Sequence, residues 1–206
     1  MRSKIVLIRH GITTGNVQRL YYGSTDVPLA EKGIKQLKEL AEQGIYPKSE
    51  TAEYYTSGML RTEQTLELLY GKQEHEVIED LRELDFGIFE MKHYQDLEGN
   101  PDYERWIHAD DESLPPPNGE SIMNFKNRIR RGFKELVVKH ELLMLKLRNR
   151  DTEAMSICIC HGGVISGILN EIWPDRYDYF YSWIPDPGHG YILTMEDGRI
   201  IGDERF

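Results

Sequence analysis

The chain has 206 residues, of which 39% are hydrophobic and 29% are charged, as expected for a globular protein with a substantial apolar core. Its 25 basic and 35 acidic side chains give a formal net charge of −10 at pH 7, and this balance disfavours binding to nucleic acid or to an anionic membrane. We therefore expect one domain over residues 1–206, with no nucleic-acid or membrane partner.

The N-terminus and the cysteines indicate where the protein resides. The first apolar run, residues 5–8, is too short for a signal peptide or a membrane span, and charged Arg9 follows it at once. Cys158 and Cys160 are the two cysteines of the chain, and their spacing matches neither a disulfide framework nor a zinc site. One intervening residue points both thiols to one face of a strand. These features predict a cytoplasmic protein with buried, reduced thiols.

Strands and helices alternate in the first part of the chain. Residues 4–8 are apolar and rich in β-branched side chains, which is typical of a strand buried on both faces of a parallel sheet. Apolar positions recur at helical spacing over residues 34–41 and again over residues 60–70. Between these helices residues 52–57 favour a strand, and residues 76–78 favour a short edge strand.

The second part begins with a segment that has no clear period. Residues 86–120 mix aromatic, charged and proline residues, and we interpret them as an inserted lid or subdomain. Residues 121–148 predict one long amphipathic helix, whose Arg and Lys side chains we interpret as a solvated face. Residues 155–160 predict a buried strand, followed by a short helix that ends near Trp173, and residues 191–195 predict the last strand.

This alternation predicts a three-layer α/β/α sandwich around a mostly parallel sheet with right-handed crossovers. In such folds ligands bind beyond the carboxyl ends of the strands. His10 and His161 stand at this position, because each directly follows one of the two most apolar strands and precedes a glycine. If these strands are neighbours in the sheet, both imidazoles face one crevice.

Two arginines accompany these histidines. Arg9 precedes His10, and Arg61 lies in the first turn of the helix that follows the second strand. A guanidinium group matches phosphate oxygens, and a helix N-terminus adds N–H donors. Either arginine alone is commonly a surface ion pair, but together with both histidines they indicate a phosphate pocket. The seven histidines show no HxH or HExxH spacing, so we expect no metal site.

Six short segments form a wider pattern along the chain: residues 9–16, 23–33, 57–65, 81–87, 117–121 and 161–163. Residues 9–16 read RHGITTGN, residues 57–65 fit the pattern SxxxRxxQT, and residues 161–163 read HGG. The types and order of these motifs resemble those of the histidine phosphatase superfamily, which includes cofactor-dependent phosphoglycerate mutases and many phosphatases of small substrates. The resemblance covers most of the chain.

The resemblance implies that His10 is the nucleophile and that three further groups hold the phosphoryl oxygens: Arg9, Arg61 and His161. The residues alone do not rank His10 above His161. Neutral imidazole is a good nucleophile near neutral pH, and positioned cations stabilise the charge of the transition state. The resemblance therefore implies metal-independent chemistry with no cofactor.

Glu83 matches the general acid of the family, which protonates the leaving oxygen and then activates water. Three other carboxylates lie close to it in the sequence: Glu79, Asp80 and Asp85. Five residues are expected to contact the substrate: Thr13, Asn16, Tyr22, Ser57 and Gly162. Ser57 either hydrogen-bonds a catalytic histidine or begins the following helix as its N-cap.

The inserted segment favours hydrolysis over mutase chemistry. Similar mutases carry a longer insertion with paired arginines, whereas residues 85–118 contain only Lys92 and Arg105 as basic residues. The aromatic side chains of this segment either pack it or cover the leaving group. We expect a phosphomonoesterase that acts on a small phosphorylated metabolite through a phosphohistidine on His10. A cofactor-dependent phosphoglycerate mutase and a catalytically silent phosphate-binding module are the alternatives. The sequence fixes neither the substrate nor the oligomeric state.

Overall fold

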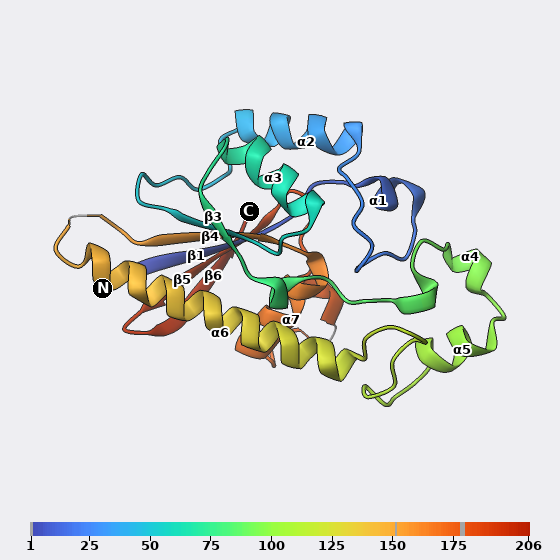
Figure 1. Cartoon of the computed structure of the whole chain (residues 1–206). Helices are drawn as coiled ribbons and strands as arrows, with labels where there is room; N and C mark the ends of the chain where they lie inside the picture. The colour runs from blue at the N-terminus through green and yellow to red at the C-terminus, as the bar shows by residue number, and fades with distance from the viewer. Residues whose placement is uncertain (1, 151, 178–179) are drawn as a thin grey trace.

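The structure is a computed structural model that describes residues 2–150, 152–177 and 180–206. A central sheet lies between two layers of helices, with α2 and α3 on one face and α6 and α7 on the other, while α1, α4 and α5 lie at one end (Figure 1). Within the described ranges, no helix is both long enough and apolar enough to cross a membrane.

The sheet has six strands in the order β3-β2-β4-β1-β5-β6. The strands are β1 (Arg2–Arg9), β2 (Glu53–Thr56), β3 (His75–Val77), β4 (Met155–Cys160), β5 (Gly190–Glu196) and β6 (Arg199–Arg205). The first four run parallel to one another, and β5 and β6 are antiparallel to their neighbours. The predicted three-layer fold with a mostly parallel sheet is confirmed.

Helices fill the connections between the strands. They are α1 (Thr14–Gln18), α2 (Glu31–Glu42), α3 (Leu60–Tyr70), α4 (Tyr94–Leu97), α5 (Pro101–Ile107), α6 (Ile122–Leu147) and α7 (Gly162–Ile172). The described residues also contain the short 3₁₀ helices η1 (Glu79–Leu81), η2 (Gly87–Phe89) and η3 (Phe180–Trp183). The long helices lie where their apolar period predicts them.

Two elements differ from the sequence-based expectation. The strand predicted as the last one, β5, is followed by β6, which pairs with it through a turn at Asp197 and Gly198. β6 is an edge strand with largely exposed, charged side chains, so it lacks the apolar run that marks the inner strands. The other element is α1, whose five residues are too short to show a helical period.

Each face of the sheet carries its own hydrophobic core. The core under α6 and α7 contains Leu7, Cys158 and Cys160, and the core under α2 and α3 contains Val6 and Ile159. Both cysteines are fully buried and free, on one face of β4 as their spacing predicts. Because β1 and β4 are buried on both sides, their ends are held rigidly.

The inserted segment, residues 86–120, carries α4 and α5 and has a small core of its own. Phe89 and Tyr103 are almost fully buried there, and Trp106 and Tyr21 pack against them. The hydroxyl oxygens of Tyr21 and Tyr103 lie 2.6 Å apart. Of the two roles left open for these aromatic side chains, packing of the insertion is the one that their contacts show.

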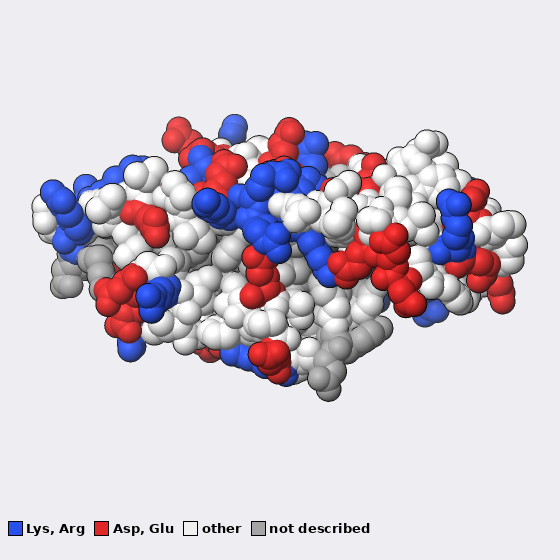
Figure 2. Space-filling view, turned by 90° about the horizontal axis from the view of Figure 1, so that it is seen from below, with Lys and Arg blue, Asp and Glu red and all other residues white. Residues whose placement is uncertain are grey.

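The charged face of α6 is exposed and paired with neighbouring elements. Its ion pairs include Lys126–Glu112, Arg130–Glu171, Arg131–Asp80, Lys139–Glu76 and Lys146–Glu53. Figure 2 shows basic and acidic side chains next to one another on the face seen from below. Such exposed pairs contribute little each to stability. This arrangement agrees with a solvated face.

Candidate active site

The two strand-end histidines lie side by side. β1 and β4 are neighbouring parallel strands in which Arg9 stands opposite Cys160, so the residues that follow both strands meet at one edge of the sheet. The backbone N–H of His10 donates to the carbonyl of Cys160 at 3.0 Å. The His10 and His161 ring centroids are 5.2 Å apart, with the ring planes inclined at 64°. Both histidines therefore belong to one site.

The hydrogen bond of His10 fixes the tautomer of its ring. Nδ1 lies 2.8 Å from the carbonyl oxygen of Gly11, which can only accept, so Nδ1 carries the proton and Nε2 presents its lone pair. Burial and the positive charges of Arg61 and Arg9 keep the pKa of His10 well below 6.5. His10 is therefore neutral at pH 7, with an unprotonated Nε2 atom.

His161 is fixed through both ring nitrogens. Arg61 Nε donates to Nδ1 at 3.3 Å, so the Nε2–H group donates to the hydroxyl oxygen of Ser57 at 2.8 Å. Burial and the charge of Arg61 lower the pKa of His161 well below 6.5 as well. Ser57 therefore hydrogen-bonds His161 and does not cap α3, whose N-cap is Met59.

Arg61 is fully buried, and carbonyl groups hold its guanidinium. Its terminal nitrogens donate to the carbonyl oxygens of Thr25 at 3.1 Å and Gly23 at 2.7 Å. Its guanidinium carbon lies 5.2 Å from the centre of the Tyr22 ring, an arrangement that stabilises the cation. The helix α3 supplies the position of Arg61, and the loop at residues 23–25 supplies its orientation.

Glu90 anchors that loop, and sequence analysis missed it. Its carboxylate accepts hydrogen bonds from four backbone N–H groups, those of Gly23, Ser24, Thr25 and Phe86. Such a cluster of donors stabilises an anion strongly. The donors in these bonds are backbone groups and not side chains. No pattern of residue types in the sequence could therefore have signalled the contacts of Glu90.

Arg9 approaches the turn after β4. One terminal nitrogen donates to the carbonyl oxygen of Pro185 at 2.8 Å. Its Nε atom is buried and has no hydrogen-bond partner among the described residues. Gly162 permits this approach, because a Cβ atom at that position would lie 3.1 Å from Arg9 Nε. A buried, unpaired N–H donor is costly unless an anion accepts from it, and a phosphoryl oxygen would do so.

Glu83 reaches the first turn of α7. Its Oε2 atom accepts from the backbone N–H of Gly163 at 3.0 Å, and its Oε1 atom accepts from that of Leu84 at 3.0 Å. The three rival carboxylates have other partners: Glu79 pairs with Arg82, Asp80 with Arg131, and Asp85 accepts from Ser24 and Gly87. Glu83 is thus the one of these four that contacts the His-Gly-Gly turn.

The remaining expected contacts form the wall next to Arg61. Thr13 is fully buried, and its hydroxyl bonds to Tyr22 at 2.7 Å and to the Asn16 side chain at 3.1 Å. Asn16 uses its side-chain oxygen to accept from Thr13, which leaves its NH₂ group to donate elsewhere. Burial raises the pKa of Tyr22, so its hydroxyl is protonated at pH 7. Thr13 therefore holds Tyr22 directly and holds the helix α1 through Asn16.

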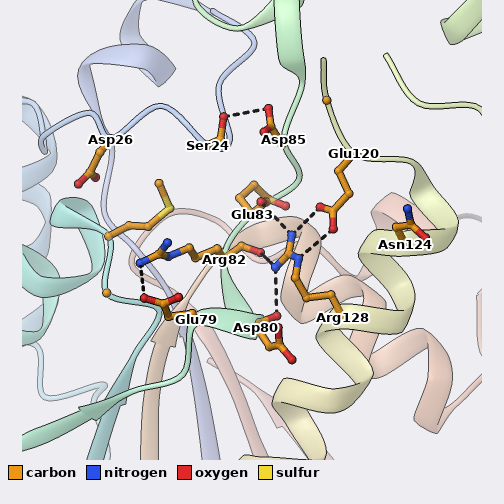
Figure 3. A pocket seen from close by; sticks show the side chains of 13 residues that line it. Ser24, Asp26, Glu79, Asp80, Arg82, Glu83, Asp85, Glu120, Asn124 and Arg128 are labelled. Atoms are coloured by element: carbon orange, nitrogen blue, oxygen red, sulfur yellow. Dashed lines mark hydrogen bonds and ion pairs between the residues drawn. The ribbon is translucent and has the colours of Figure 1, made fainter. Parts of the chain in front are cut away.

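A cavity of about 620 Å³ lies beside Glu83 (Figure 3), and its lining includes neither of the two histidines and neither Arg9 nor Arg61. Its walls carry more acidic than basic side chains, and Arg82 and Arg128 are its basic residues. Across the part of the chain that the structure describes, no group of three or more His, Cys, Asp or Glu side chains is arranged to hold a metal ion.

Known proteins resemble this chain in sequence and in fold. The family model of the histidine phosphatase superfamily (branch 1) matches residues 5–202. A Salmonella typhimurium protein named adenosylcobalamin/alpha-ribazole phosphatase is 33% identical over 132 residues, covering 62% of this chain and 64% of that protein. The Escherichia coli protein of that name is 30% identical over 170 residues, covering 74% and 82%. A Proteus mirabilis protein named probable phosphoglycerate mutase is 33% identical over 131 residues, covering 61% and 59%.

The matches thus span less than two thirds of the Salmonella and Proteus relatives. Two solved structures show the same fold. A putative alpha-ribazole-5′-P phosphatase from Escherichia coli has a TM-score of 0.78 at 23% identity, covering 99% of this chain and 94% of that one. A phosphoglycerate mutase from Bacillus anthracis has a TM-score of 0.74 at 20% identity, covering 100% and 92%.

Proposed function

The chain belongs to branch 1 of the histidine phosphatase superfamily, and on that premise we propose that it hydrolyses a small phosphorylated metabolite through a phosphohistidine on His10. The observation that carries this proposal is the neutral His10 ring, whose Nε2 lone pair is available in a site that also holds two buried or partly buried arginines. A nucleophile and cations placed together are what phosphoryl transfer requires.

In the first step, His10 Nε2 attacks phosphorus, an N–P bond forms, and the bond from phosphorus to the leaving oxygen breaks. Glu83 donates its proton to that oxygen, so the product leaves as an alcohol. Arg9 offers its unpaired Nε–H to a phosphoryl oxygen, and Arg61 adds positive charge beside both imidazoles. These groups stabilise the negative charge in the transition state.

In the second step, a water molecule attacks phosphorus and the N–P bond breaks. Glu83, now a carboxylate, takes the proton of the water, and the electron pair returns to His10 Nε2. Inorganic phosphate is released, and both groups regain their starting protonation. The resemblance implies that His161 holds a phosphoryl oxygen, but both of its ring nitrogens are bonded to Ser57 and Arg61 in the structure. We therefore assign to His161 the positioning of Arg61 in both steps.

Phosphoglycerate mutase activity is the second candidate, because curated relatives carry that name. A mutase must hold a second acidic group of its substrate. The inserted segment offers Lys92 and Arg105 for this purpose, and both are exposed in the structure. Their placement on the surface supports hydrolysis.

The test uses the purified chain with 4-nitrophenyl phosphate in the presence of a metal chelator. We expect phosphate release that the chelator does not change, since arginines supply the positive charge. Strong inhibition by the chelator would contradict the mechanism. A screen of phosphorylated metabolites, beginning with a ribazole phosphate because of the relatives' names, then identifies the substrate.

Trapping the intermediate separates the candidate functions. His10→Ala is expected to abolish acid-labile protein phosphorylation, whereas His161→Ala leaves a part of it. Phosphate trapped on His161 in the unmodified protein would reverse the assignment. Interconversion of phosphoglycerates faster than their hydrolysis would support a mutase, and phosphate binding without a phosphoenzyme would support a silent module.

A further inference from the structure

We propose that Arg128 is a positioning residue for Glu83, which it holds through the backbone of residues 80–83. Arg128 lies on α6 and lines the cavity beside Glu83 (Figure 3). The inference rests on the proposed role of Glu83 as general acid. It assigns to Arg128 no contact with the substrate.

The guanidinium of Arg128 binds three backbone carbonyl groups of the segment that ends in Glu83. One terminal nitrogen donates to the carbonyl oxygens of Asp80 at 3.1 Å and Arg82 at 2.8 Å. The other donates to the carbonyl oxygen of Glu83 itself at 3.3 Å. The planar guanidinium thereby fixes the backbone on both sides of Arg82, the residue before Glu83.

Glu120 fixes the guanidinium in turn. Its carboxylate accepts from Arg128 Nε at 2.9 Å and from a terminal nitrogen at 2.6 Å, a bidentate pair. Both side chains are less than 20% exposed, at 19% and 18%. The backbone N–H of Glu120 also donates to the carbonyl oxygen of Asp85 at 2.9 Å. Residues 80–85 are therefore held from both ends.

These contacts leave Arg128 no free donor for a substrate. Arginine has five N–H groups, and the five hydrogen bonds of Arg128 use them on three carbonyl oxygens and two carboxylate oxygens. The Phe125 ring, 5.3 Å from the guanidinium carbon, covers one side of the group. Although Arg128 is a basic residue that lines the cavity, all of its donors are used within the protein, so it has a structural role in the cavity wall.

Close packing of α6 against the same segment supports this reading. Gly132, one helical turn after Arg128, meets the segment so closely that a Cβ atom there would lie 2.9 Å from Leu81 Cδ2 and 3.0 Å from the Asp80 carbonyl carbon. Leu81 is fully buried beneath this contact. Helix α6 thus acts as the rigid support on which the Glu83 segment rests.

The position of the Glu83 carboxylate depends on this support. The carboxylate is held by two backbone N–H groups, those of Gly163 and Leu84. The N–H group of Gly163 lies on α7, and that of Leu84 directly follows Glu83 in the chain. A shift of residues 80–85 therefore breaks their alignment. A lysine at position 128 keeps the charge but has a single nitrogen on a flexible stem, and it cannot reproduce the planar fork.

A displaced general acid has a kinetic signature that a general loss of stability lacks. Phenyl phosphate and 4-nitrophenyl phosphate have similar shapes, but phenolate is the more basic leaving group and needs protonation more. The parameter kcat/KM reports the step in which the leaving group departs. General acid catalysis typically contributes about 10²–10⁴-fold. We expect Arg128→Lys to lower kcat/KM about tenfold for phenyl phosphate and less than about threefold for 4-nitrophenyl phosphate.

Two further variants are measured alongside Arg128→Lys. Arg131→Lys is the matched control, because Arg131 is an exposed residue of the same helix and binds the same segment only through the Asp80 side chain. We expect this variant to keep the kcat/KM values of the unmodified protein for both substrates. Glu120→Gln leaves the three carbonyl contacts in place and weakens the charge pair, so it should show the selectivity of Arg128→Lys to a smaller extent.

Glu83→Gln separates this inference from the proposed function. If it lowers kcat/KM equally for both substrates, the general-acid role fails. If it is selective for phenyl phosphate while folded Arg128→Lys is not, only the positioning role fails. In the double variant we expect Arg128→Lys to add little to Glu83→Gln, and fully multiplicative losses would overturn the proposal. Should Arg128→Lys not fold, Glu120→Gln decides, and equal losses on both substrates would overturn the proposal.

Discussion

Acid should destabilise this protein through one buried histidine outside the active site. His140 on α6 is fully buried, with Nε2 2.8 Å from the Ser3 hydroxyl on β1 and Nδ1 2.9 Å from the Ser156 hydroxyl on β4. The Ser3 hydroxyl donates to the sulfur of Met144, so it accepts from Nε2–H, and Ser156 donates to Nδ1. The network satisfies a neutral imidazole. If Nδ1 gained a proton, that proton would face the Ser156 hydroxyl, whose own hydrogen already points at Nδ1.

The size of the effect follows from the pKa of His140. Burial lowers this pKa from 6.5 to about 4, and the negative charge of Glu53 offsets a part of that shift. The unfolded chain therefore binds a proton that the folded protein refuses, and stability falls as the pH drops from 6.5 toward 4. The full loss is about 3 kcal/mol, and between about pH 7 and about pH 5 it is about 2 kcal/mol.

Urea unfolding of the unmodified protein and of His140→Gln, each at about pH 7 and about pH 5, measures this contribution. Glutamine keeps a donor and an acceptor but does not titrate. The variant is expected to be less stable at both pH values and to lose about 2 kcal/mol less between them. His10 and His161 titrate in both proteins, so their contributions cancel. Equal losses in the two proteins would show that His140 is protonated in the fold and would refute the reasoning.

Three further predictions concern the site. Gly163→Ala places a Cβ atom 2.5 Å from Glu83 Oε1, so kcat/KM for phenyl phosphate should fall about tenfold, and 4-nitrophenyl phosphate should be less affected; equal effects would contradict the contact. Ser57→Ala removes a hydrogen bond to His161 worth about 1 kcal/mol, so kcat/KM should fall roughly fivefold, and an unchanged rate would show that the bond is dispensable. Burial and two arginines hold the pKa of His10 well below 6.5, so its ring protons in NMR spectra should not titrate between about pH 7.5 and about pH 6. A titration midpoint at 6.5 or above would contradict the neutral nucleophile.

The elements that could be predicted from the sequence are those whose environment is uniform along their length. β1 and β4 are buried on both faces, so their apolar runs are unbroken, and the residues at their ends follow directly. The pairing of these two strands, which the sequence left open, brings His10 and His161 together. β6 escaped prediction because an edge strand exposes most of its side chains.

The supporting residues of the site could not be predicted because their partners are backbone groups. Glu90 accepts from N–H groups of a distant loop, and Arg128 donates to carbonyl oxygens of a turn. Every residue offers the same backbone atoms, so these contacts impose no residue type on the partner segment. Only the path of the folded chain reveals them.

The two arginines beside His10 have two effects. The charges of Arg61 and Arg9 are suited to phosphate, and together with burial they also lower the pKa of His10. The same charges therefore help to keep the His10 ring unprotonated near neutral pH. The pKa of His161 is lowered for the same reasons, and that of His140 by burial. Each of these imidazoles binds a proton more readily in the unfolded chain, so the burial and positive charge that keep His10 and His161 neutral also contribute to the acid sensitivity of the fold.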